Sequence, residues 1–150
     1  MTDTFRTNRT SSNTDPLQSC ITQMLAEAPM DSRKMIPTGK IEALAASLWE
    51  WFQSTDGVSV RLRAASSVDA DLLGHYILEI VGPDRPFLVD SFLGACSELG
   101  IEVLTLFHPI VELEDGAHSL IQIHLPDLTV REQEDLLAEA QATLSDVIDA

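Results

Sequence analysis

Apolar residues recur every three or four positions in four segments of the chain, the spacing of a helix that buries one face. Pro16 stands in the first turn of the first segment, and Pro29 stops it. Gly100 closes the third segment, with Ile101 as the apolar partner of a left-handed cap, and the run from Thr129 to Glu132 is a capping box before the fourth. The predicted helices span residues 16–28, 40–53, 85–99 and 130–148.

Four other segments alternate apolar and polar residues, the period of a β-strand with one buried face. Tyr76, Leu78 and Ile80 carry the apolar phase of the second one. Pro109 lies inside the third and cannot donate a ladder hydrogen bond, which places this strand on a sheet edge or puts a bulge in it. The turn at 115–116 (Asp-Gly) makes a hairpin with the fourth. The predicted strands span residues 58–63, 75–81, 103–113 and 118–125.

This order of elements predicts an α+β domain in which two helices cover one face of a four-strand antiparallel sheet. Ferredoxin-like folds have one more strand after their second helix, and it lies at the sheet edge beside the first strand. Either that strand is missing from this chain, or the strand at 58–63 takes its place through an antiparallel connection. The predicted organisation is a disordered tail at 1–15, N-terminal helices at 16–53 and the α+β domain at 54–150.

Net charge, apolar stretches and cysteine spacing exclude several classes of protein. The formal net charge of −15 repels the phosphate backbone of nucleic acids and anionic membranes. No apolar stretch reaches the ~20 residues of a membrane span, and the polar N-terminus does not have the pattern of a secretory signal. Cys20 and Cys96 lie far apart and form no metal-type or redox-type pair. We therefore expect reduced cysteines, no bound metal and a cytoplasmic location.

The run Gly82-Pro83-Asp84-Arg85-Pro86-Phe87, between a strand and a helix, is the candidate ligand site. Backbone N–H groups at a helix start suit a carboxylate, and the guanidinium of Arg85 could pair with it. Asp84 is the expected N-cap, and the alternative is a capped helix with Arg85 in solvent. His108, on the predicted edge strand, is either a further contact for an effector or partner or a structural residue. The candidate effector-binding residues are Asp84, Arg85, Pro86, Phe87 and His108.

Polar side chains from two strands share the phase opposite the apolar residues. Imidazoles with a carboxylate suit zinc, but no two of these residues have a tight local ligand spacing. We expect instead that this sheet face stays free of helices and meets another domain or subunit. The interface candidates are His75, Glu79, Gln122 and His124.

The strand and helix order, with the turn at 82–86, resembles ACT domains, which are small modules that sense amino acids and regulate metabolic enzymes. The ACT turn usually reads Asp/Asn-Arg-Pro-Gly, and its glycine lets a ligand approach the backbone. Phe87 stands in the place of that glycine. We expect its side chain to fill the space next to the backbone, so that the turn serves as a packing and regulatory junction.

A narrower resemblance covers about residues 40–147. Leu48-Trp49-Glu50-Trp51, the run from Val81 to Ser91 with its Pro-Phe-Leu-Val-Asp-Ser, and His108-Pro109-Ile110 are similar to the N-terminus of the large bacterial NAD-specific glutamate dehydrogenases. This resemblance implies that the 150 residues are a non-catalytic N-terminal regulatory and assembly domain. The full-length enzyme would convert glutamate, NAD and water to 2-oxoglutarate, ammonium and NADH.

No cofactor is expected in this part of the chain, because it has no GxGxxG turn of a nicotinamide site, and NAD would bind elsewhere in the full-length enzyme. The resemblance implies that the partners are other segments of the same enzyme or a second copy, with an amino acid as an effector. Two alternatives remain open: a free-standing amino-acid sensor related to ACT domains, and a structural interaction domain without a ligand.

Overall fold

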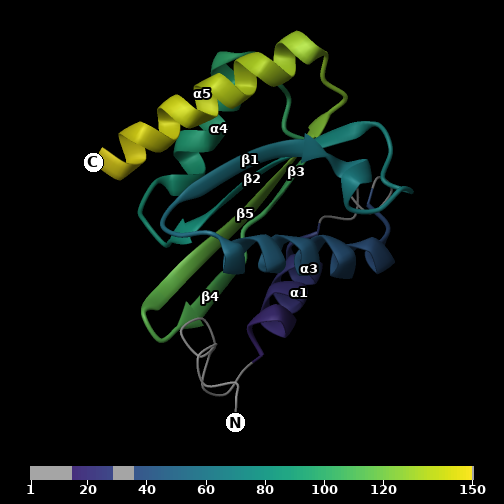
Figure 1. Ribbon diagram of the computed structural model, residues 1–150. Coiled ribbons are helices and arrows are strands. Elements are labelled where there is room, and N and C mark those ends of the chain that lie inside the picture. Colours follow the sequence, from purple (N-terminus) through teal and green to yellow (C-terminus); the bar gives the residue numbers. More distant parts are fainter. Residues whose placement is uncertain (1–14, 29–35, 150) are drawn as a thin grey trace.

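The computed structural model describes residues 15–28 and 36–149, and its elements follow the predicted order (Figure 1). The expected tail at 1–15 lies, except for Asp15, outside the described residues. The elements are α1 (Pro16–Glu27), α3 (Thr38–Ser54), β1 (Ser59–Ala64), the 3-10 helix η2 (Ala65–Ser67), β2 (His75–Pro83), α4 (Leu88–Glu98), β3 (Thr105–Phe107), β4 (Ile110–Leu113), β5 (Gly116–Pro126) and α5 (Val130–Asp149).

Two of the sequence signals at the helix ends are confirmed, the capping box at Thr129 and the left-handed cap at Gly100. The Thr129 N–H donates to Glu132 Oε1 at 2.9 Å, and the Glu132 N–H donates to Thr129 Oγ1 at 3.1 Å, so the capping box before α5 is closed. Gly100 adopts φ +68° after α4, and the Ile101 N–H returns to the carbonyl oxygen of Cys96 at 3.0 Å. These contacts fix the end of α4 and the start of α5.

The sheet has the strand order β1-β2-β5-β3, with β4 also paired to β5, and all pairs are antiparallel. The strand predicted at 58–63 therefore takes the edge position beside β2. The segment predicted as one strand at 103–113 forms two short strands on the opposite edge, separated at His108 and Pro109. This break agrees with the expected edge position of Pro109, which has no N–H to donate to the ladder.

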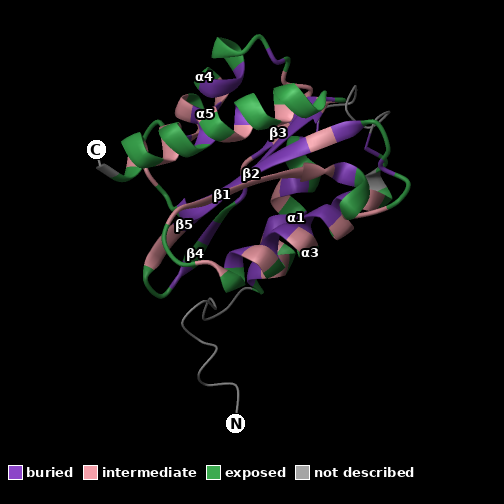
Figure 2. Cartoon of the chain, turned by 45° about the horizontal axis from the view of Figure 1, so that its top comes forward, coloured by how far each residue is buried: buried purple, intermediate pink, exposed green. Residues whose placement is uncertain are grey.

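Helices cover both faces of the sheet, which gives three layers (Figures 1 and 2). α4 and α5 lie on one face, as predicted. α1 and α3 lie on the other, which we expected to be free of helices. The physical reason is that the strand phase that looked polar also carries apolar residues: Ile77, Val81 and Leu120 have no exposed surface and pack with the apolar residues of α1 and α3. The division of the chain at residue 54 stays a prediction, although these helices share one hydrophobic cluster with the sheet.

Side chains of α1 cap the backbone of the β3–β4 edge. Gln23 Nε2 donates to the carbonyl oxygen of Ile110 at 2.8 Å, and Gln23 Oε1 accepts from the Ile110 N–H at 2.9 Å. Glu27 Oε1 accepts from the N–H of His108 at 2.9 Å. Burial raises the pKa of Glu27, and the hydrogen bond from His108 partly offsets that rise. The two side chains satisfy backbone groups that an exposed edge strand would leave unpaired.

No helix within residues 15–28 and 36–149 is both long and apolar enough to cross a lipid bilayer.

Candidate functional site

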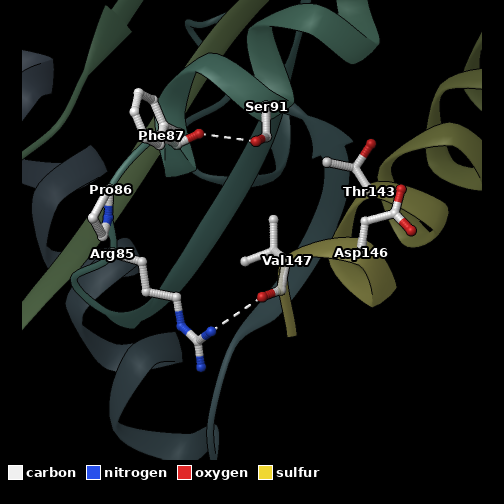
Figure 3. Close-up of a pocket in the computed structure, with 7 residues that line it drawn as sticks. All are labelled: Arg85, Pro86, Phe87, Ser91, Thr143, Asp146 and Val147. Atoms are coloured by element: carbon white, nitrogen blue, oxygen red, sulfur yellow. Dashed lines mark hydrogen bonds between the residues drawn. The ribbon is translucent and has the colours of Figure 1, made fainter. Parts of the chain in front are cut away.

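An open pocket of about 580 Å³ lies between the turn that precedes α4 and the C-terminal part of α5 (Figure 3). Three of the five residues proposed from the sequence for effector binding line it. The lining residues are Arg85, Pro86, Phe87, Ser91, Thr143, Asp146 and Val147. The pocket therefore joins the turn to residues about 60 positions further along the chain, which the sequence analysis did not single out.

Gly82 lets the strand approach its neighbour closely just before the turn. A Cβ at this position would lie 2.9 Å from the backbone Cα of Val58, closer than side-chain atoms approach in folded proteins. The Asp84 N–H donates to the carbonyl oxygen of Ala117 at 2.9 Å, which ties the turn to β5. The turn is thus held from both sides of β2.

Asp84 is not the N-cap of α4, in contrast to the prediction. The helix begins three residues later, after Phe87, and Asp84 Oδ1 accepts a hydrogen bond from the hydroxyl of Ser119 at 2.7 Å. Pro86 accordingly precedes the helix instead of lying in its first turn. The carboxylate faces the sheet because the antiparallel register places Ser119 opposite Gly82, next to the turn.

Phe87 occupies the left-handed region of backbone space, with φ 65° and ψ 9°, and it is the only residue other than glycine with a positive φ among the described residues. Such a conformation costs a residue with a Cβ about 1–2 kcal/mol. The Phe87 carbonyl oxygen accepts from the Ser91 N–H and the Ser91 Oγ, both at 2.9 Å, which holds the turn. Phe87 is 77% exposed, so its side chain stands at the rim of the pocket. The expectation that it fills the space beside the backbone is therefore wrong.

Arg85 connects the turn to α5. Its Nη1 donates to the carbonyl oxygen of Val147 on α5 at 3.1 Å (Figure 3). The alternative of Arg85 wholly in solvent is therefore incorrect. Asp146 of α5 also lines the pocket.

The pocket thus lies between the start of one helix and the end of another. The N-terminus of α4 carries a partial positive charge, and Arg85 and Asp146 add full charges of both signs. Pro86, Phe87 and Val147 supply apolar surface beside them. This arrangement suits a small zwitterion that has an apolar part.

Asp84 and His108 form a separate group with Ser119. The Ser119 hydroxyl donates to Asp84, so its oxygen is free to accept from His108 Nε2, 3.0 Å away. Burial lowers the pKa of His108, and the nearby Asp84 partly opposes this. A nucleophilic serine would donate its proton to the histidine, whereas this one donates to a carboxylate, so the three side chains are not arranged for nucleophilic catalysis.

The four interface candidates lie beneath α1 and α3 and do not form an exposed face. His75, Glu79, Gln122 and His124 are at most 3% exposed. They bond in a row across β2 and β5: Gln122 Nε2 donates to Glu79 Oε2 at 2.7 Å, His124 Nε2 lies 2.7 Å from Gln122 Oε1, and His75 Nε2 lies 3.1 Å from His124 Nδ1. Polar residues are tolerated in this core because each one satisfies the next.

Two arginines of β1 extend the row, and the sequence analysis did not connect them to it. Arg61 Nε donates to Glu79 Oε1 at 2.6 Å, and Arg63 donates to the same carboxylate through Nε at 2.9 Å and Nη2 at 3.2 Å. Arg63 Nη2 also donates to Ser47 Oγ on α3 at 2.7 Å. The signal that could have revealed them is the alternation of Arg61 and Arg63 in the strand phase of Glu79.

Burial favours the neutral form of both histidines of the row. Burial lowers the pKa of His124 to about 3, with a further contribution from His75, and burial also lowers the pKa of His75. A neutral His124 that donates from Nε2 to Gln122 Oε1 has its Nδ1 left as an acceptor on the side of His75. Within the described part of the chain, no three His, Cys, Asp or Glu side chains lie together as a possible metal site.

Comparison with known families gives one match. The model of the glutamate dehydrogenase ACT1 domain matches residues 20–145, which include both helix layers and every strand of the sheet. No curated protein and no solved structure matches the chain significantly. Because the family model covers most of the sequence, the chain belongs to the family of glutamate dehydrogenase ACT1 domains.

Proposed function

We propose that this chain is a non-catalytic regulatory and assembly domain of an NAD-dependent glutamate dehydrogenase. The match to the ACT1 domain model over residues 20–145 is the observation that carries the proposal. The parent enzyme would convert glutamate, NAD and water to 2-oxoglutarate, ammonium and NADH, with NAD bound outside this chain. Two free, buried cysteines support a cytoplasmic enzyme.

The chemistry of the described residues supports a role without catalysis. The hydroxyl of Ser119 is engaged by a carboxylate, and the buried histidines bond to neighbouring side chains beneath two helices. These groups stabilise the fold and offer no open position to a substrate. The partners would be other segments of the same enzyme or a second copy of it.

The test begins with the gene. The reading frame should continue past Ala150 into a region with a Gly-rich dinucleotide-binding turn. The purified full-length protein should then produce NADH from NAD only when glutamate is present. Removing residues 1–150 should alter assembly or effector response while the catalytic region stays able to reduce NAD. A reading frame that stops at Ala150, or a full-length protein with no glutamate-dependent NADH formation, would refute the assignment.

The pocket at Arg85 favours a second candidate, an amino-acid sensor. The carboxylate of an amino acid would face Arg85 and the start of α4, and its ammonium would face Asp146. The side chain would lie against Pro86 and the ring of Phe87. Unlike the regulatory assignment alone, this candidate requires binding by the 150 residues themselves.

Calorimetry and thermal shift with each common amino acid test the sensor. An amino acid that binds should lose affinity on Arg85→Gln and on Asp146→Asn, whereas Arg131→Gln, on the exposed start of α5, serves as the matched control. The absence of both heat and thermal shift for every amino acid would leave the domain as a structural interaction module without a ligand.

A further inference from the structure

The two edges of the sheet differ in what bonds to their backbone groups. The β3–β4 edge has the side chains of Gln23 and Glu27 bonded to its backbone. β1, on the other edge, pairs with β2 along Ser59–Ala64, and no strand in the described ranges pairs with its outer side. In Figure 2 this strand runs between α5 on one side and α3 on the other.

β1 lacks two of the features that protect an edge strand from pairing, a proline and a bulge. Its six residues pair with β2 in unbroken register, and its sequence (SVRLRA) contains no proline and no glycine. All six are partly exposed. An antiparallel edge of this kind directs the backbone N–H and C=O of alternate residues outward, where another strand can bond to them.

The charge on this edge determines what kind of strand it accepts. Arg61 and Arg63 point to the same sheet face, and both bond to the single carboxylate of Glu79. Arg61 donates to this carboxylate through Nε, its guanidinium lies over the Trp51 ring at 4.2 Å from the centroid, and its Nη2 is buried without a hydrogen-bond partner, so an added strand would reach only the exposed remainder of the group. The side chains of the two arginines are still 28% and 19% exposed. Glu50 on α3 is near enough to act on the charge of Arg61, but it forms no ion pair with it.

A second copy of β1 does not suit this edge. If two antiparallel β1 strands kept the sheet faces aligned, Arg61 of one copy would lie opposite Arg61 or Arg63 of the other. Four guanidiniums would then surround two Glu79 carboxylates, and like charges directly opposite each other destabilise a strand pair. The net charge of −15 does not remove the local preference for acid, because charges beyond about 8 Å are screened at physiological salt.

We propose that the outer edge of β1 accepts, as an added strand, an extended segment of another polypeptide with Asp or Glu at alternate positions. The backbone groups of β1 supply the ladder, and Arg61 and Arg63 bond to the acidic side chains that share their sheet face. The edge is therefore a docking strand for a partner, independent of the pocket at Arg85.

The test uses the 150-residue chain and a nine-residue peptide that alternates threonine with glutamate, blocked at both ends and carrying a fluorophore. Anisotropy should detect binding that weakens as salt is raised. A peptide with lysine in place of glutamate should not bind. The glutamate peptide N-methylated at alternate residues should not bind either, because it cannot complete a ladder. Hydrogen exchange of the β1 amides should slow when the glutamate peptide is present.

Variants locate the site. Arg61→Gln should weaken binding about threefold to fivefold, the range for one partly exposed ion pair. Arg61→Lys should retain most of the affinity, and Glu112→Gln, an exposed residue on the opposite edge, should change nothing. Equal binding of the glutamate and lysine peptides, undiminished binding of the N-methylated peptide, no binding at millimolar peptide, or unchanged exchange of the β1 amides would each overturn the proposal. The peptide comparisons use the unmodified chain, so they decide the question even if Arg61→Gln does not fold.

Discussion

Replacing Glu79 with glutamine should be among the most destabilising single changes in the sheet. Glu79 is 0% exposed and accepts four hydrogen bonds, from Arg61 Nε, Arg63 Nε, Arg63 Nη2 and Gln122 Nε2, at 2.6–3.2 Å. Glutamine keeps the size of the side chain but removes its charge. The N–H groups of the new amide would also face other donors, from Arg61 and Arg63 in the Oε1 position or from Arg63 and Gln122 in the Oε2 position. The two guanidiniums would then have no carboxylate partner.

Breaking a buried ion pair by removing one partner costs about 3–5 kcal/mol. A domain of this kind has a total stability of about 5–15 kcal/mol, so the change would remove a large part of it. With a urea dependence of about 2 kcal/mol per molar, the unfolding midpoint should fall by roughly 2 M. Urea titration followed by circular dichroism measures it directly. Glu112→Gln, an exposed glutamate of β4, is the matched control and should leave the midpoint in place.

A triple variant distinguishes the loss of the ion pairs between Glu79 and the two arginines from the loss of packing. Changing Arg61, Glu79 and Arg63 together to methionine removes all the charges, so no charged group stays buried alone, and it should cost less than Glu79→Met by itself. A loss under about 1 kcal/mol for Glu79→Gln would show that water reaches the row and that the ion pairs contribute little. A triple variant less stable than Glu79→Met would contradict the account of an uncompensated charge.

Four further outcomes follow from single features of the structure. Phe87→Gly should be more stable than Phe87→Ala by about 1 kcal/mol, or about 3 °C in melting temperature, because only glycine adopts the left-handed conformation freely; equal melting temperatures would argue against strain at this residue. Gly82→Ala should lower the free energy of unfolding by about 1–3 kcal/mol, since the new Cβ meets Val58 at 2.9 Å, and an unchanged urea midpoint would rule out that contact. The pKa of His124 is about 3 in the fold and 6.5 in the unfolded chain, so its contribution to stability is complete above pH 6.5 and falls by about 1.4 kcal/mol per pH unit toward pH 3. Between pH 7 and pH 5 the urea midpoint should therefore fall less steeply in His124→Gln than in the unmodified chain. An equal slope in the two proteins would refute this. Burial raises the pKa of Cys20 to about 12 and that of Cys96 to about 11, so a thiol reagent at pH 8 should label the protein only in urea, and rapid labelling of the native chain would contradict their burial.

The sequence was sufficient where local chemistry determines the structure. The capping box at Thr129 and the left-handed cap at Gly100 appear as predicted, because each depends on residues within one or two turns. The strand at 58–63 took the edge position beside the second strand, one of the two arrangements that the sequence left open. The resemblance carried by the turn at 82–91 and by His108-Pro109 led to the family that the comparison supports.

The sequence failed where polar residues satisfy one another across the sheet. Glu79 looked like part of an exposed face because nothing nearby in the chain marks Arg61, 18 positions earlier, as its partner. Only the antiparallel register, which sets Arg61 opposite Glu79, shows that this carboxylate is neutralised and can be buried. Only one side of the pocket was predicted, for the same reason. The turn residues 85–87 were identified from the sequence, but Asp146 and Val147 reach the pocket only through the packing of α5.

The bonding of Gln23 to the backbone of Ile110 has a practical consequence for how the chain can be shortened. One glutamine side chain occupies both the donor and the acceptor of that residue, so α1 stands in for a neighbouring strand. A chain that began at α3 would keep its sheet but uncover the β3–β4 edge, in addition to the edge at β1. Such a truncated chain would have an unpaired strand on each edge of its sheet, so that copies could associate edge to edge without closing into a defined oligomer. Its self-association should rise steeply with concentration.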